Sequence, residues 1–233
     1  MKNSNIYAGL AIMVGLIVLG LQFPKAVKDF KAFDRTVNVK GLCEREVKAD
    51  KAIWPISFKV VGNDLGSVYD EIEKKNEAVI GFLTAGGVDK ADISIGTYSI
   101  SDKYAQEYGS NDRTYRYVAK CNVTVCSKDV DNILSLIGNQ KDLLKNGIAP
   151  ENEWDVKPEF EFEGLNDLKP DMIEEATKNA REVALKFAKD SDSRLGKIKE
   201  AAQGTFSISD RDSNTPYIKK VRVVTNVTYY LSK

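Results

Sequence analysis

The sequence predicts an α+β fold in which antiparallel β hairpins pack with about three amphipathic helices, preceded by one N-terminal transmembrane helix. Segments with a period of two alternate along the chain with segments of helical period. Apolar residues make up 42% of the sequence, which is enough to build a core. The run Ile6 to Phe23 carries no charge. We therefore expect an anchor or signal at 1–24, a charged stalk at 25–35 and one folded domain at 36–233.

The uncharged run has the length needed to cross a bilayer. As a helix, residues 6–23 would span about 27 Å, close to the roughly 30 Å hydrocarbon core. The flank Gly20 to Lys25 lacks the A-x-A-like triplet of a cleaved signal, and the run is longer than a typical signal core. An uncleaved anchor held in the lipid bilayer is the favoured interpretation, with a cleaved signal as the alternative.

The first half of the domain predicts two strands, a helix and two more strands. Alternation favours strands at 36–41 and 53–61, and Ala49-Asp50-Lys51 between them predicts a hairpin. Apolar residues at helical spacing then predict a helix over 65–83, with Asn63 or Asp64 as its cap and Gly86-Gly87 at its end. Strands follow at 92–100 and 115–126, joined by a polar loop.

The second half adds two helices and three strands. We expect a helix over 129–145, a strand over 154–162, a helix with Pro170 at its first position, and strands at 203–209 and 218–231. The sequence Ser-Ile-Ser-Asp occurs at 99–102 and at 207–210, each time followed by a loop, a tyrosine and an Asn-x-Thr strand. This pattern predicts that one helix, strand, loop, strand unit occurs twice.

Composition excludes several classes of function. Lys plus Arg equals Asp plus Glu at 34 each, so the chain has no excess positive charge to attract nucleic acid. Histidine is absent, which excludes serine-histidine and cysteine-histidine catalysis. The alternating glutamates at 159, 161 and 163 are typical of a half-buried strand rather than a metal site. We expect no cofactor and no metal, and the sequence names no small-molecule ligand.

Two groups of side chains are candidates for a specific role. Aromatic and basic residues in and after the 102–114 loop predict a contact surface made of Tyr104, Tyr108, Arg113 and Tyr115. The three cysteines leave two alternatives open. Either Cys43 and Cys121 form a disulfide across neighbouring strands in an exported domain, or all three thiols are free and buried.

The sequence resembles the SIMPL-domain family of bacterial envelope proteins, also called YggE-like. The resemblance covers essentially 36–233 and lies in the order and spacing of short motifs. These are Val37-x-Val39-x-Gly41, Val47-x-Ala49-Asp50-x-Ala52, Gly87-Val88, Asp92-Ile93, Tyr117, Gly147, Glu175-Ala176, Ala180-Arg181, Ala184, Ala188 and Leu195-Gly196-Lys197-Ile198. The chain departs from common members in its uncleaved-looking anchor and in an acidic, aromatic segment at 152–168.

The resemblance implies a compact α+β fold, export to the periplasm, assembly of at least some members into large rings, and no catalytic residues. We therefore expect a non-enzymatic binding or scaffold protein of the bacterial inner membrane that faces the periplasm, self-associates and contributes to envelope or oxidative stress tolerance.

Alternative readings of function and sidedness remain. Lys25, Lys28, Lys31 and Arg35 follow the apolar run, and positive-inside counting would leave the domain in the cytoplasm. The resemblance, to a family named after a signalling molecule, then implies a cytoplasmic signalling adaptor as an alternative. A hydrolase that uses carboxylates alone, from Glu44, Glu46 or Asp50, is the enzymatic alternative.

Overall fold

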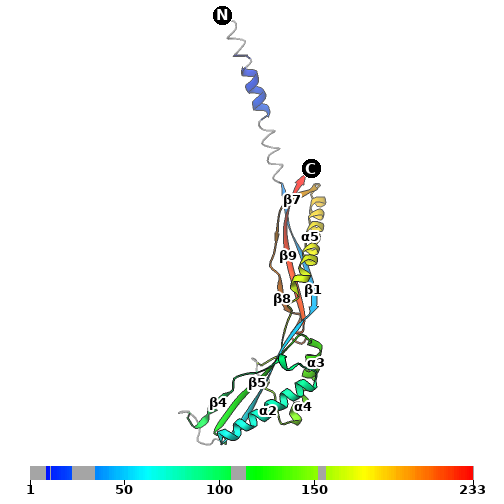
Figure 1. The fold of residues 1–233 in the computed structure, drawn as a ribbon. Helices are drawn as coiled ribbons and strands as arrows, with labels where there is room; N and C mark the ends of the chain where they lie inside the picture. Colours follow the sequence, from blue (N-terminus) through cyan, green and yellow to red (C-terminus); the bar gives the residue numbers. More distant parts are fainter. Residues whose placement is uncertain (1–8, 11, 23–34, 106–113, 152–155, 233) are drawn as a thin grey trace. The chain divides into compact units, whose positions relative to one another are not determined.

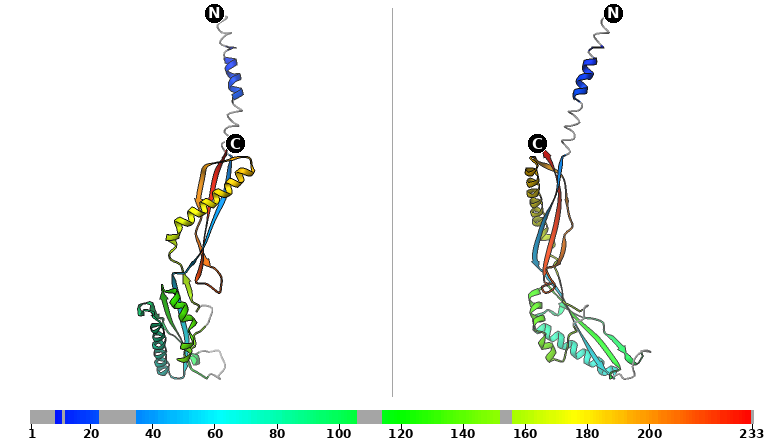
Figure 2. Two further views of the ribbon diagram at one scale, coloured as in Figure 1. Left: turned by 90° about the vertical axis from the view of Figure 1, so that its right-hand side faces the viewer. Right: turned by 180° about the vertical axis from the view of Figure 1, so that it is seen from behind.

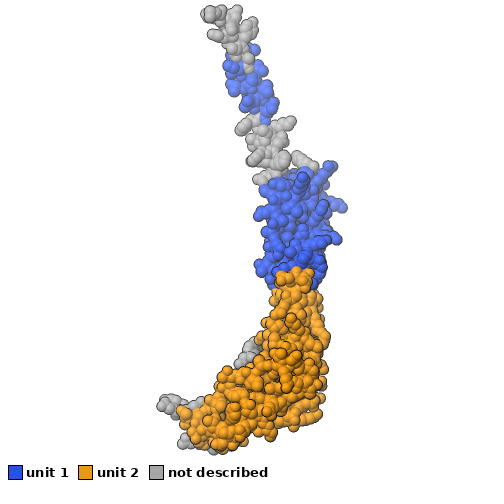
Figure 3. All heavy atoms as spheres, viewed as in Figure 1, with its two compact units in different colours: residues 1–45, 168–207, 221–233 blue, residues 46–167, 208–220 orange. Residues whose placement is uncertain are grey.

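The computed structural model describes residues 9–10, 12–22, 35–105, 114–151 and 156–232 and has an α+β fold (Figure 1). The chain divides into two compact units (Figure 3). Unit 1 comprises residues 1–45, 168–207 and 221–233, and unit 2 comprises 46–167 and 208–220. Each unit is therefore built from segments that are distant in the sequence.

One sheet is formed by the strands of the middle of the chain, in the order β3-β5-β2-β6, with β4 also paired to β5. The strands are β2 (Lys51–Gly62), β3 (Ile93–Ile95), β4 (Ser99–Asp102), β5 (Tyr117–Ser127) and β6 (Glu159–Glu161). β2 and β5 form a long antiparallel ladder from Ala52↔Ser127 to Gly62↔Tyr117. This sheet has β4 at an edge, attached to β5 alone.

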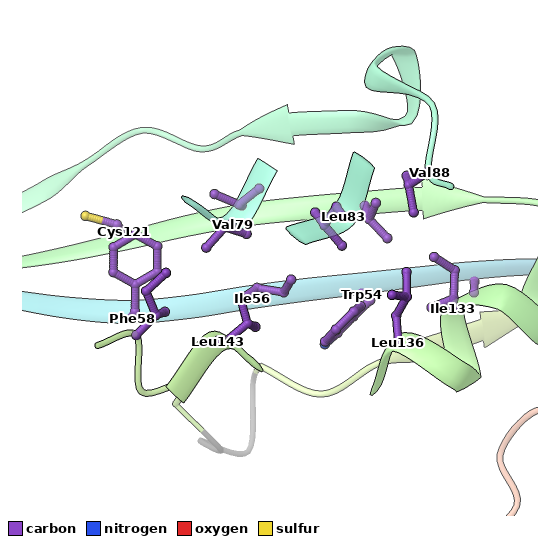
Figure 4. Packing of buried hydrophobic residues seen from close by; sticks show 14 of the residues in the cluster. Trp54, Ile56, Phe58, Val79, Leu83, Val88, Cys121, Ile133, Leu136 and Leu143 are labelled. Carbon is purple, nitrogen blue, oxygen red and sulfur yellow. The ribbon is translucent and has the colours of Figure 1, made fainter. Parts of the chain in front are cut away.

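Helices α2 (Leu65–Ala85), α3 (Val130–Gly138) and α4 (Lys141–Lys145) supply apolar side chains to the core against this sheet (Figure 4). Asp64 caps α2 by accepting a hydrogen bond from Ser67 N–H at 2.8 Å, and Gly87 ends it with a φ of 87°. Both ends of this helix agree with the prediction from the sequence. Large buried residues fill the space between the layers, among them Trp54, Ile56, Phe58, Ile72, Leu83 and Leu143.

The other sheet has the order β1-β9-β7, with β8 paired to β9. Its strands are β1 (Thr36–Lys48), β7 (Arg194–Gln203), β8 (Ser207–Asp210) and β9 (Ile218–Ser232). Helix α5 (Leu165–Asp190) lies along one face (Figure 2) and buries a row of one methionine and four alanines. The row recurs every four residues and consists of Met172, Ala176, Ala180, Ala184 and Ala188.

A glycine in β1 allows the close approach of α5. A Cβ atom on Gly41 would lie 1.8 Å from the carbonyl oxygen of Ala176 and 2.8 Å from the Cβ of Ala180. Both separations are far below van der Waals contact, so no other residue fits here without moving the helix. Gly41 and the alanine row therefore set the distance between helix and sheet.

The predicted duplication is present in the structure. The segments 96–102 and 204–210 read Gly-Thr-Tyr-Ser-Ile-Ser-Asp and Gly-Thr-Phe-Ser-Ile-Ser-Asp. In each, the glycine N–H donates a hydrogen bond to the neighbouring long strand, from Gly96 to Asn122 O at 2.8 Å and from Gly204 to Val224 O at 2.9 Å. We call α2–β3–β4–β5 the first repeat and α5–β7–β8–β9 the second.

A second pair of hydrogen bonds fixes the alignment of the repeats. Lys103 N–H donates to Arg116 O at 2.7 Å, and Arg211 N–H donates to Ile218 O at 2.9 Å. The loop of the first repeat is thus six residues longer than that of the second. The two Asn-x-Thr triplets, which the sequence seemed to align, are offset by two residues in this register.

Several predictions about elements were wrong. β1 and β2 do not form a hairpin, because they belong to different sheets, β1 beside β9 and β2 between β5 and β6. Strand β7 was not predicted before Gln203, since its charged residues hide any alternation. Pro170 lies inside α5, which begins five residues earlier at Leu165. The helix expected over 129–145 is interrupted between α3 and α4.

Part of the predicted anchor lies outside the described residues. Residues 9–10 and 12–22 are helical, and large side chains along them are exposed, including Leu10, Ile12, Leu16, Leu19 and Leu21. Within the described residues, no helix has both the length and the apolar character needed to cross a membrane. The boundary expected at residue 24 and most of the 25–35 stalk fall among residues that the structure does not describe.

Candidate interaction surface

Two of the four residues predicted to form a contact surface are described, and both are exposed. Tyr104 follows β4 and is 62% exposed, while Tyr115 precedes β5 and is 47% exposed. Tyr108 and Arg113 lie in the part of the loop outside the described residues. The hairpin of β4 and β5 therefore carries two tyrosines whose rings face solvent.

An arginine that the sequence analysis missed contacts the ring of Tyr104 and that of a further tyrosine, Tyr117 of β5. Arg116 donates to the carboxylate of Asp102 through Nη2 at 2.9 Å and through Nε at 3.1 Å. Its guanidinium carbon lies 5.8 Å from the ring centre of Tyr104 and 4.9 Å from that of Tyr117, so the cation stacks on both rings. The pair lowers the pKa of Asp102 and raises the pKa of Arg116.

Backbone contacts fix the base of the hairpin. Asp102 also accepts a hydrogen bond from Tyr104 N–H at 2.9 Å, and Asn63 accepts one from Arg116 N–H at 2.8 Å. We call Tyr104, Tyr115, Arg116 and Tyr117 the tyrosine surface. Its one arginine is neutralised by Asp102, so it offers aromatic area and phenol hydroxyls for contact. The signal for Arg116 was its place next to Tyr117, the residue that pairs with Asp102 across the hairpin.

Unit 1 carries a second polar cluster around a buried thiol. Cys43 is only 1% exposed, and its thiol interacts with the carboxylate of Glu175, which also accepts a hydrogen bond from Arg45 Nη2 at 3.0 Å. Arg45 first, and the thiol second, lower the pKa of Glu175, whereas burial raises the pKa of Cys43. A neutral, shielded thiol is a poor nucleophile. A shallow depression of about 280 Å³ beside the cluster is lined by Arg45, Asp171, Glu174, Glu175 and Lys178.

The cysteines are free in the structure. Cys43 and Cys121 are both buried, as the free-thiol alternative expected, but Cys126 is exposed. Cys43 lies in β1 and Cys121 in β5, and these strands belong to different sheets. The neighbouring-strand relation on which the expected disulfide depended therefore does not hold.

The carboxylates considered for hydrolysis have ordinary partners. Glu44 lies 3.4 Å from Arg222 and Glu46 lies 3.5 Å from Arg211. Asp50 accepts hydrogen bonds from the backbone N–H groups of Glu163 and Gly164, both at 2.8 Å. These contacts stabilise turns and strand edges.

The alternating glutamates behave as the strand interpretation predicts. Phe160 of β6 is buried, and the glutamates on either side of it are exposed. Lys51 pairs with Glu161 at 2.9 Å and with Glu163 at 3.0 Å, which raises the pKa of the lysine. In the described part of the chain, no group of three or more Cys, Asp or Glu residues could hold a metal ion.

A comparison with models of known protein families gives a match over most of the chain. The model of the family SIMPL, described as a protein of unknown function (DUF541), matches residues 37–229. No curated protein matches the chain. The matched range begins one residue into β1 and ends within β9, so it includes both repeats and both sheets.

Proposed function

Because the chain belongs to the SIMPL family, we propose that it is a membrane-anchored, envelope-facing, non-enzymatic binding or scaffold protein that contacts a partner through the tyrosine surface. The observation that carries this proposal is the exposure of Tyr104 and Tyr115 on a hairpin whose base is fixed by the Asp102–Arg116 pair. Fixed aromatic groups lose little conformational entropy on binding, which favours contact surfaces of this kind.

The anchor is supported by the apolar helical residues near the N-terminus. Their large side chains are exposed in the described part of that helix, and lipid is the solvent in which such exposure costs nothing. The family resemblance supports export of the domain to the periplasm, self-association and a contribution to envelope or oxidative stress tolerance. A bacterial inner-membrane protein with a single N-terminal segment fits these expectations.

Site-specific photo-cross-linking in native membranes tests the contact surface. A photoreactive phenylalanine replaces Tyr104 in one full-length variant and Tyr230, an exposed tyrosine of β9, in a control. We expect cross-linked products that are specific to position 104. Equal yields at both positions would contradict the proposed surface.

Fusion reporters test the sidedness of the domain. Alkaline phosphatase at the carboxyl terminus is active only after export, whereas green fluorescent protein fluoresces when it stays in the cytoplasm. We expect phosphatase activity without fluorescence. The reverse result would favour the cytoplasmic adaptor, and release of the full-length chain from membranes by carbonate would argue against the anchor.

A further inference from the structure

We propose that the hydroxyl group of Tyr98 is a positioning group for the tyrosine surface, holding the start of β4 against α2. We call the hydrogen bonds of Tyr98 to α2 the device. The inference rests on the proposed function only for what the device is for, since its effect on β4 does not depend on any partner. Tyr98 lies just before β4, where the pairing with β5 changes register by one residue between Ile95↔Val123 and Ser99↔Lys120. The edge is weakest at such a break, because an extra residue interrupts the ladder.

Tyr98 spans this break with two hydrogen bonds to α2. Its hydroxyl donates to Glu73 Oε1 at 2.7 Å and accepts from Asn76 Nδ2 at 2.9 Å. The bond to Glu73 is the main reason that the pKa of Tyr98 rises to about 12. The hydroxyl therefore stays protonated and able to donate throughout the neutral range.

Asn76 shows that this contact is more than a chance surface bond. It is 1% exposed and lies on the face of α2 that otherwise buries Val68, Ile72, Val79 and Leu83. Its Oδ1 has no hydrogen-bond partner among the described residues. The bond from Nδ2 to the Tyr98 hydroxyl is therefore the main hydrogen bond of this buried side-chain amide. A polar group in an apolar helix face costs stability, and it is kept where it specifies one arrangement.

The second repeat shows what the same segment looks like without the device. Phe206 occupies the position of Tyr98, and it has no hydroxyl to bind α5. The loop that follows is short and is fixed by Asp212, which accepts hydrogen bonds from Asn214 N–H and Thr215 N–H at 2.8 Å each. The longer hairpin of the first repeat carries the exposed tyrosines, and this is the hairpin with the additional hydrogen bonds from Tyr98 to α2.

Tyr98 is connected to the tyrosine surface by the four residues of β4. β4 runs from Ser99 to Asp102, and Asp102 holds Arg116 against Tyr104 and Tyr117. β4 pairs with β5 alone, so its place rests on that ladder, on the Asp102–Arg116 pair at its end and on the bonds of Tyr98 to α2 at its start. Loosening of Tyr98 should therefore increase opening of this hairpin while the rest of the sheet stays closed.

Residue-resolved amide hydrogen exchange on the full chain in detergent micelles tests the device. The Lys103 N–H, bonded to Arg116 O, reports on the first repeat, and the Arg211 N–H, bonded to Ile218 O, is the matched control in the second. In Tyr98→Phe we expect exchange at Lys103 to rise about tenfold, with Arg211 unchanged. The second repeat has Phe206 at the equivalent position, so phenylalanine is compatible with this backbone and the variant should fold.

A second pair of variants keeps the test decisive. Glu73→Ala removes only the outer acceptor and should raise exchange at Lys103 by a smaller factor. Glu71→Ala, on the same helix, removes a carboxylate that forms ion pairs with Lys74 and Lys75, and it should leave exchange at Lys103 unchanged. Unchanged exchange at Lys103 in Tyr98→Phe, or an equal rise at Lys103 and Arg211, would overturn the inference.

The result is separable from the test of the proposed function. Faster exchange at Lys103 together with no preferential cross-linking at position 104 would support the device and reject the contact surface. Preferential cross-linking at position 104 with unchanged exchange in Tyr98→Phe would support the surface and reject the device.

Discussion

Helix α2 and helix α5 each pack on a sheet, but the two contacts are built in opposite ways. We call α2 with its sheet the α2 layer, and α5 with its sheet the α5 layer. Between α2 and its sheet, large side chains such as Trp54, Ile56 and Phe58 fill a wide space. Between α5 and its sheet, alanines face Val39 and Gly41, and the backbones approach closely. Both arrangements exclude water, but the first depends on large side chains that fill the space and the second on small residues that let the backbones approach.

The difference teaches which change damages each layer. Truncation should damage the α2 layer, where removal of a large residue leaves a cavity. Enlargement should damage the α5 layer, where any added atom must displace the helix. Chain composition offers a separate reporter for one unit, because both tryptophans, at 54 and 154, fall within the segment 46–167 of unit 2.

The largest expected effect is a truncation in the α2 layer. Phe58→Ala should lower the free energy of unfolding of unit 2 by about 3–5 kcal/mol, because the ring is 1% exposed. Denaturant unfolding followed by tryptophan fluorescence measures this. The matched control is Tyr69→Ala on α2, whose side chain is 51% exposed, and it should change the stability of unit 2 by less than about 0.5 kcal/mol. Equal losses in both variants would refute the contrast.

The next effect is an enlargement in the α5 layer. Gly41→Ala places a methyl group where the Ala176 carbonyl oxygen lies, and it should destabilise unit 1 by about 1–3 kcal/mol. Far-UV circular dichroism of the full chain, to which α5 contributes, should show earlier loss of helix, whereas tryptophan fluorescence should show an unchanged transition for unit 2. If the variant is as stable as the parent, the close approach described here is incorrect.

A smaller, pH-dependent effect should appear in the α5 layer. The pKa of Glu175 is lowered from its ordinary value of 4.5 by Arg45 and by the Cys43 thiol. The ionised form is thus favoured by folding, so its contribution is complete above pH 4.5 and is lost as the pH falls through the lowered pKa. Since Glu175 is partly exposed, solvent limits the size of this contribution.

Glu175→Gln separates this contribution from general acid denaturation. The variant should be less stable than the parent at neutral pH and should converge with it at low pH, as followed by the circular dichroism of α5. A constant difference between the two at every pH would show that the carboxylate charge is not involved.

The smallest effect should be a gain of stability. Gly81 lies in α2, and a Cβ there would meet nothing within 4 Å. Gly81→Ala should therefore stabilise the α2 layer by about 0.5–1 kcal/mol through helix propensity alone. Tryptophan fluorescence during denaturant unfolding measures the shift. The same exchange at Gly41 should have the opposite sign, which makes the two variants a direct test of the contrast.

Local patterns allowed most elements to be predicted, because caps and periodicity act over a few residues. Asp64 and Gly87 mark the ends of α2 in the sequence as in the structure. The pairing of β1 with β9 could not be predicted, since it joins strands from opposite ends of the chain. Ala49 and Asp50 separate β1 from β2, as the turn of a hairpin would, but the two strands join different sheets.

The candidate surface was predicted in part for the same reason. Tyr104 and Tyr115 are visible as exposed aromatic residues of a polar loop. The roles of Asp102, Arg116 and Tyr98 depend on which residues face one another across a hairpin and on α2, and these relations arise only in the folded chain. Alignment of the two repeats would have drawn attention to the Tyr98 and Phe206 difference.

The order of strands β1-β9-β7 has a consequence for how the protein is made. β1 has β9 as its neighbour, and β9 begins at Ile218, long after β1 ends at Lys48. At about 5–20 residues per second, the ribosome needs on the order of ten seconds or more to deliver this partner. Until β9 is made, the edge of β1 is open to pairing with other chains, which makes this strand the exposed point of the nascent protein.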